Sequence, residues 1–268
     1  MSRNSLTAAS AARRIEVRYA GVELAYYAAL CSITGYLAVF LSWKGIPDAW
    51  ISLASSAFTV LTILLQLVIS RFSDLNRRVR LNAVIAAVGC VTLLCCALMA
   101  FLRLPLMLFL GVFILTVAFH RAMNGPINAL MMQFADAGFP VNYGWTRGVG
   151  SLSYAVMSYA LGALIARFSP ALLPYSAMVV LVACILFVLT MPAPKALREK
   201  VLAGGNAVPA AASAARSPAE PPCTYAEMLR SNPVLTLFLL SCVLSALGQT
   251  TGLTFMNRIV EGAGGGVR

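Results

Sequence analysis

The sequence predicts an all-α polytopic membrane protein, and three observations support that class. Of its 268 residues, 60% are hydrophobic and only 11% are charged, and the mean hydropathy of +0.84 is too high for a soluble globular protein of this length. Apolar stretches of roughly 18 to 25 residues recur, each long enough to cross a hydrocarbon core of about 30 Å as a helix. Cationic residues gather in alternate connections between these stretches.

Seven apolar stretches predict membrane-spanning helices. In order, they are Val22–Ser42, Ala49–Ser70, Leu81–Leu102, Pro105–Phe134, Gly144–Phe168, Ala171–Met191 and Val234–Met256. The first is full-length and others follow it directly, so no cleavable secretory signal is expected. The expected domains are a cytoplasmic N-terminal tail at 1–18, a six-helix transmembrane bundle at 19–191, a cytoplasmic linker at 192–232, and a seventh helix starting a second bundle at 233–268.

The linker is predicted from its composition of alanine, proline, serine and charged residues, which is too polar to span a membrane and too poor in bulky apolar residues to form a core. A lone seventh helix after such a linker is typical of the start of a second bundle. We therefore expect a chain that is truncated after its seventh transmembrane helix.

Positive charges predict the orientation. They flank the first stretch and fill the second and sixth connections, at Arg3, Arg13, Arg14, Arg18, Arg71, Arg77, Arg78, Arg80, Lys195, Arg198, Lys200, Arg216 and Arg230. By the positive-inside rule these segments are cytoplasmic, which accounts for the net charge of +11 without nucleic acid. We expect a multi-pass protein of a bacterial plasma membrane with a cytoplasmic N-terminus.

The sequence carries no pattern of an enzyme or a metal centre. The seven cysteines lack metal-ligand spacing, so they are interpreted as small packing residues, and no cofactor or metal is expected. No predicted span holds a His-x-x-x-His pair with an acid, a Gly-x-Ser-x-Gly motif or paired aspartates. We therefore expect a protein without enzymatic activity.

Polar residues mark the first two stretches. Glu23 shares a helical stripe with Tyr27; it reaches the membrane interface, or it is buried as a proton acceptor or the partner of an arginine. The second stretch has a polar face that fits either close helix packing or a water-filled path, formed by Ser52, Ser55, Thr59, Thr62 and Gln66. In the connection that follows, Asp74 is expected to cap the third helix or pair with an arginine.

The fourth stretch is the most polar within the membrane. His120, Asn124 and Asn128 are spaced by four and share a face, with Arg121 adjacent. Histidine in a membrane helix is commonly a packing residue, but an arginine beside it near mid-span favours a function. Pro126 removes a backbone donor from the same helix.

The fifth stretch places a forked donor, a hydroxyl and an aromatic plane on one face, at Arg147, Ser151 and Tyr154, over about 10 Å of rise. This row suits a ligand with several hydroxyls and an apolar ring face, such as a sugar. The alternative is that Arg147 points back to lipid headgroups while the nearby glycines only allow close helix packing.

These features resemble the major facilitator superfamily, whose two six-helix halves are joined by a long cytoplasmic linker. The loop around Asp74 is similar to the superfamily's signature between its second and third helices, although Ser70, Leu75 and Arg77 depart from the pattern. The segment Tyr143-Gly144-x-x-Arg147-x-x-Gly150, followed by Tyr154 and preceded by Pro126, resembles the oligosaccharide:proton symporter branch, which includes lactose permease. Ala129 stands where lactose permease has a sugar-binding glutamate, which argues against lactose as the substrate.

The resemblance implies secondary active transport, in which two halves rock around a site at the midplane. The expected N-terminal wall binds a small polar, sugar-like solute with a proton as co-substrate and consists of Arg147, Ser151, Tyr154, His120, Asn124 and Asn128. Ser245 and Gln249 would contribute from the seventh helix, Glu23 would couple the proton, and Asp74 and Arg78 would form a gating or structural loop.

Other functions stay open at this point. Drug or metabolite efflux is an alternative direction of transport, and a non-transporting membrane sensor or a nonfunctional fragment is an alternative of another class. Because the opposite wall would come from the missing C-terminal helical bundle, this chain alone is expected to be inactive.

Overall fold

A computed structural model describes residues 8–76, 79–203, 230–234, 236–237, 240–241 and 244–245. Every regular element within these ranges is a helix, which confirms the predicted all-α class. The chain divides into two units, Met1–Ala214 and Ala215–Arg268. In the second unit, helical residues are described between Arg230 and Ser245.

The first unit contains the six spans expected before the linker. The first span comprises α1 (Ala8–Leu30), the π-helix η1 (Cys31–Gly35) and α2 (Leu37–Trp43). The others are α3 (Asp48–Leu75), α4 (Leu81–Phe101), α5 (Leu106–Ala122) with α6 (Asn124–Asp136), α7 (Tyr143–Arg167) and α8 (Leu172–Leu189), and a short α9 (Pro194–Ala203) follows. Five of these spans are long and apolar enough to cross a membrane, and the first makes a sixth if its bent halves count as one.

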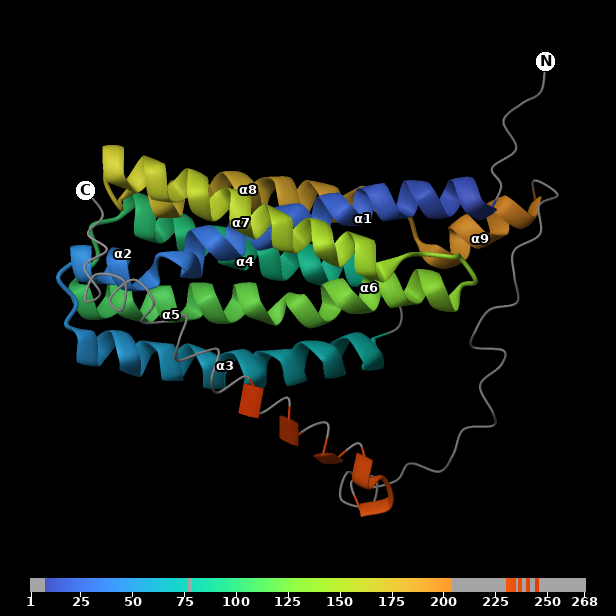
Figure 1. Cartoon of the computed structure of the whole chain (residues 1–268), viewed down its shortest axis with the longest axis horizontal. Coiled ribbons are helices and arrows are strands. Elements are labelled where there is room, and N and C mark those ends of the chain that lie inside the picture. The colour runs from blue at the N-terminus through green and yellow to red at the C-terminus, as the bar shows by residue number, and fades with distance from the viewer. Residues whose placement is uncertain are drawn as a thin grey trace. The chain divides into compact units, whose positions relative to one another are not determined.

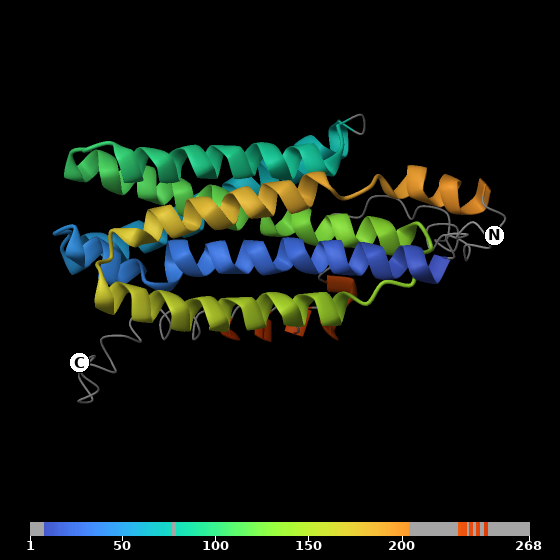
Figure 2. The ribbon, with the colours of Figure 1, turned by 90° about the horizontal axis from the view of Figure 1, so that it is seen from above.

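The spans run side by side in one bundle (Figures 1 and 2). Helix α1 packs against α7 and α8, α4 packs against α8 and α5, and α3 packs against α5. Apolar side chains fill the space between them in two main clusters. This arrangement places α1 beside α7 and brings α6 close to both of them at the end where α7 begins.

The polar face of α3 is satisfied largely within its own helix. The hydroxyls of Ser55, Thr59 and Thr62 donate to backbone carbonyls four residues earlier, at 2.7 to 2.9 Å. Gln66 differs, because its Nε2 donates to the backbone carbonyl of Arg121 in α5 at 3.4 Å. The face therefore bonds mainly to its own backbone, and its members Ser52 and Thr59 are exposed.

Two segments expected to lie outside the spans, the tail at 1–18 and the linker at 192–232, contain helix. The first helix begins at Ala8 rather than Val22, so the described part of the expected tail is helix. Alanine favours helix, and Ala11, Ala12 and Ile15 are buried against the second apolar cluster. In the expected linker, Pro194 begins α9, as proline commonly does at a first helical position, and Val201 is buried in the same cluster.

Two spans are broken. The first bends by 45° beyond η1, where Tyr36 has non-helical φ and ψ of −118° and 29°. The fourth divides at Met123, because Pro126 has no N–H with which to bond the carbonyl of Ala122. Gln249, Arg78 and most of the seventh stretch lie outside the described residues, as does the side chain of Asp74.

Candidate functional site

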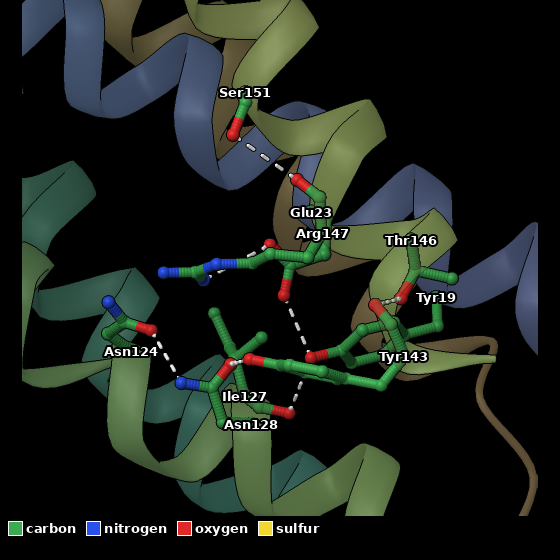
Figure 3. Close-up of polar contacts among 9 residues, drawn as sticks. All are labelled: Tyr19, Glu23, Asn124, Ile127, Asn128, Tyr143, Thr146, Arg147 and Ser151. Carbon is green, nitrogen blue, oxygen red and sulfur yellow. Dashed lines mark hydrogen bonds and ion pairs between the residues drawn. The ribbon is translucent and has the colours of Figure 1, made fainter. Parts of the chain in front are cut away.

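An ion pair joins Glu23 of α1 to Arg147 of α7 (Figure 3). Nη1 of Arg147 lies 3.6 Å from Oε2 of Glu23. The Glu23 side chain is 1% exposed, whereas that of Arg147 is 37% exposed. The sequence left two positions open for Glu23, at the membrane interface or buried, and the structure shows it buried with an arginine partner. The guanidinium extends from this carboxylate toward the surface of the first unit.

The pair is close but incompletely bonded. Neither Oε2 of Glu23 nor Nη1 of Arg147 has a hydrogen-bond partner among the described residues, although both atoms are buried. Buried polar atoms are rarely left in this state, because the lost hydrogen bond costs about 1–3 kcal/mol. The two atoms can therefore still accept from, or donate to, a small polar molecule.

Tyr19 holds the other oxygen of the carboxylate. It lies four residues before Glu23 on the same face of α1, and its hydroxyl donates to Oε1 at 2.8 Å. The same hydroxyl lies 3.2 Å from the backbone carbonyl of Ile127 in α6. A hydroxyl has only one proton, so the shorter hydrogen bond to the carboxylate is the stronger of the two. The contact with Ile127 holds α6 close to α1.

Arg147 is held by an aromatic face and a glycine. Its Cζ lies 4.9 Å from the ring centroid of Tyr27, a cation–π contact. The ring fits against α7 only because position 150 is glycine: a Cβ there would lie 2.6 Å from Cδ2 of Tyr27 and 3.1 Å from Oε2 of Glu23. The close approach of α1 and α7 at Gly150 thus shapes the site.

The start of α7 is fixed by its own cap and by α1. Asn142 precedes the helix, and its side-chain oxygen accepts from the backbone N–H of Trp145 at 3.1 Å. The backbone N–H of Asn142 donates to Oε1 of Glu16 at 2.6 Å. Further along, Ser153 donates to the carbonyl of Leu24 at 2.7 Å. These contacts fix the position of α7 along α1, and with it the position of Arg147 relative to Glu23.

A chain of hydrogen bonds connects α7 to α6 beside the ion pair (Figure 3). The hydroxyl of Tyr143 donates to Oδ1 of Asn128 at 3.0 Å, and Nδ2 of Asn128 donates to Oδ1 of Asn124 at 2.9 Å. Both asparagines are half-buried. Three helices thus bring carboxylate, guanidinium, phenol and amide groups together in one place.

The other expected residues of the fourth span lie apart from this network. His120 is fully buried at the end of α5 and stacks on Tyr26, with 4.7 Å between ring centroids. Neither of its ring nitrogens has a hydrogen-bond partner in the described part of the chain. Arg121 turns toward α3, where its Cζ lies 5.2 Å from the ring centroid of Phe58. The helix break at Met123 separates both residues from the α6 asparagines.

The expected row on α7 is not a continuous set of partners. Ser151 is exposed, and its hydroxyl donates back to the carbonyl of Arg147 at 3.4 Å. Tyr154 lies further along the helix and packs on the larger apolar cluster, with its hydroxyl 3.3 Å from where a Cβ of Gly35 would lie. The structure therefore joins Arg147 to Glu23 and Tyr27 rather than to Ser151 and Tyr154.

Two residues of the site, Tyr19 and Tyr143, were not predicted as site residues from the sequence. Tyr19 could have been found from its spacing of four before Glu23, which puts both on one helical face. Tyr143 belongs to the fifth-span motif, but only the folded chain shows that its hydroxyl meets Asn128.

The sequence model of the MFS_1 like family matches residues 17–260 of the chain, a range that contains the whole site. Comparisons with curated proteins and with solved structures found no match.

Proposed function

Because the chain belongs to the MFS_1 like family, a family of the major facilitator type of membrane transporter, we propose that it takes up a sugar or a similar small polar solute together with a proton. The proposal rests on the ion pair between Glu23 and Arg147, which is incompletely hydrogen-bonded. Hydroxyl and amide groups from three helices surround this pair. Binding would alternate between the two sides of the membrane as two bundles rock around the site.

The groups around the ion pair suit a polyhydroxyl ligand. Arg147 presents a planar fork of donors, and the Tyr143–Asn128–Asn124 chain offers hydroxyl and amide groups that donate and accept. Hydroxyl oxygens of the solute would accept from the guanidinium, and hydroxyl protons would be donated to Oε2 of Glu23 or to an amide oxygen. Tyr154, two helical turns beyond Arg147, is the proposed aromatic contact for an apolar ring face.

The same ion pair supports coupling to a proton. A carboxylate buried as deeply as Glu23 is stable as an anion only while a cation remains beside it. A solute that draws Arg147 away would leave Tyr19 as the remaining partner, and Glu23 would bind a proton. When the solute leaves, Arg147 would return and the proton would be released.

Arg147 is tested by changing its donor geometry while keeping its charge. Uptake of labelled sugars and nucleosides is measured in cells that express the complete open reading frame, with Arg147→Lys compared with Arg167→Lys at the other end of α7. We expect Arg147→Lys to lower uptake at least about tenfold, because an ammonium group cannot replace a two-pronged contact. Arg167 lies over Phe168 at 5.7 Å and is expected to tolerate the change.

Glu23→Gln tests the coupling, with Glu199→Gln on α9 as its control. We expect Glu23→Gln to equilibrate the solute but not to accumulate it when a proton gradient is imposed. Unchanged uptake by Arg147→Lys would remove Arg147 from the binding site, and unchanged proton-driven accumulation by Glu23→Gln would remove Glu23 from the coupling.

A further inference from the structure

A pocket with two arginines in a mainly apolar lining lies between the start of α1 and α9. It encloses about 300 Å³ and is lined by Ala11, Arg14, Ile15, Arg18, Pro192, Ala196 and Leu197. In Figure 1, α9 lies beside the beginning of α1, on the side where α8 ends. None of the seven lining residues belongs to the Glu23–Arg147 site, so the pocket is a separate feature of the first unit.

Two arginines on one face of α1 give the pocket its charge. Arg14 and Arg18 are four residues apart, so their side chains are neighbours on the helix, and both are exposed. Nη1 of Arg18 donates to the backbone carbonyl of Thr190 at 3.0 Å, which turns this guanidinium toward the end of α8. Among the described residues, no carboxylate lies within 4 Å of either guanidinium. Like charges at this spacing repel, and an anion between them would remove the repulsion.

The remaining walls are apolar, and the pocket lies just beyond the end of a helix long and apolar enough to cross a membrane. Ala11 and Ile15 are buried, and Leu197 is half-buried against the same apolar cluster. The membrane-crossing helix α8 ends at Leu189, three residues before the lining residue Pro192. A ligand here would meet two guanidinium groups beside apolar surface, at the depth where phosphate headgroups join acyl chains.

We propose that this pocket binds the phosphate group of an anionic phospholipid. Arginine forks match phosphate oxygens, and the apolar wall formed by Ile15 and Leu197 favours a lipid over a free phosphate ion. The bound headgroup would connect α1 to α9, the first helix after the sixth span, and so hold the start of the connection to the second unit against the bundle. This proposal does not depend on which solute the protein carries.

Native mass spectrometry of the full chain in detergent, titrated with phosphatidylglycerol or phosphatidylcholine, tests the proposal. We expect phosphatidylglycerol to bind more tightly, and Arg14→Gln and Arg18→Gln each to weaken it about fivefold, the usual effect of one basic residue at an anionic lipid surface. Arg13→Gln is the matched control, because Arg13 is an exposed neighbour that does not line the pocket. The double variant Arg14→Lys/Arg18→Lys keeps the charge but loses both forks, so its affinity should lie between that of the unchanged protein and that of Arg14→Gln/Arg18→Gln.

Three results would overturn the proposal. The first is phosphatidylglycerol binding that is unchanged in the folded Arg14→Gln/Arg18→Gln variant. The second is an equal loss in Arg13→Gln, which would show that only the overall charge matters. The third is displacement of phosphatidylglycerol by inorganic phosphate at an equal concentration, which would assign the pocket to the free ion.

Discussion

A methyl group added at Gly150 should disrupt the contact between α1 and α7 at the ion pair. The Cβ of Gly150→Ala would lie 2.6 Å from Cδ2 of Tyr27, and ordinary contact begins at 3.4 Å, so the ring must move by about 0.8 Å. That ring also faces Arg147, with 4.9 Å between Cζ and the ring centroid. Moving Tyr27 therefore disturbs the position of the guanidinium as well as the helix packing.

The change in the unfolding free energy follows from two costs and one gain. Overpacking of a tight contact costs about 1–3 kcal/mol. Weakening the cation–π contact costs about 0.5–1 kcal/mol. Alanine in a helix gains about 1 kcal/mol over glycine. Gly148→Ala, two residues away, meets nothing within 4 Å among the described residues and keeps only the gain. The alanine gain is common to both variants, so the unfolding free energy of Gly150→Ala should lie about 1.5–4 kcal/mol below that of Gly148→Ala.

Thermal unfolding of the two purified variants in the same detergent measures this difference. For a chain of this size about 2–4 °C corresponds to each kcal/mol, so Gly150→Ala should melt about 3–16 °C below Gly148→Ala. Solute uptake should fall in Gly150→Ala. Equal melting temperatures would refute the packing of Tyr27 against α7, and with it the geometry assigned to Arg147.

Two further predictions concern single hydrogen-bonding groups. Asn82 donates to the carbonyls of Val188 and Met191 at 3.1 and 2.8 Å, so Asn82→Ala should lower the unfolding free energy by about 1–3 kcal/mol, as measured by thermal unfolding. An effect no larger than that of Asn76→Ala, an exposed residue, would contradict this role. Tyr143→Phe removes the bond to Asn128 and should raise the KM of uptake about two- to tenfold with little effect on the melting temperature; an unchanged KM would place Tyr143 outside the binding site.

The spans were predictable because a bilayer requires long apolar helices whose backbone groups bond internally. That requirement does not extend beyond the hydrocarbon, where the expected tail and linker contain helix. The helix before Val22 and the helix α9 are stabilised because Ile15 and Val201 are buried in the same apolar cluster. That cluster joins segments that are distant in the sequence. The 45° bend after η1 follows Gly35, a residue that disfavours helix, but the segment Cys31–Tyr36 holds no proline that would have predicted a bend of this size.

The candidate site was predictable as a set of costly groups, but not as an arrangement. Charged residues in apolar stretches are expensive, so Glu23 and Arg147 were identified separately. Their pairing depends on the packing of α1 against α7, which brings distant parts of the chain together. Helical spacing predicted that Ser151 shares a face with Arg147; in the structure the Ser151 hydroxyl bonds to its own helix, and its part in binding stays a prediction. Spacing within one helix does not show which neighbouring helix covers a face.

The double variant Glu23→Gln/Arg147→Gln tests most directly whether the buried ion pair serves transport rather than only the fold. Each single neutralisation leaves one charge without its partner and should lower the melting temperature. In the double variant no unpaired charge remains, so the melting temperature should recover toward that of the unchanged protein while proton-driven accumulation of the solute does not recover. Uptake by the double variant equal to that of the unchanged protein would contradict a role for the pair in transport.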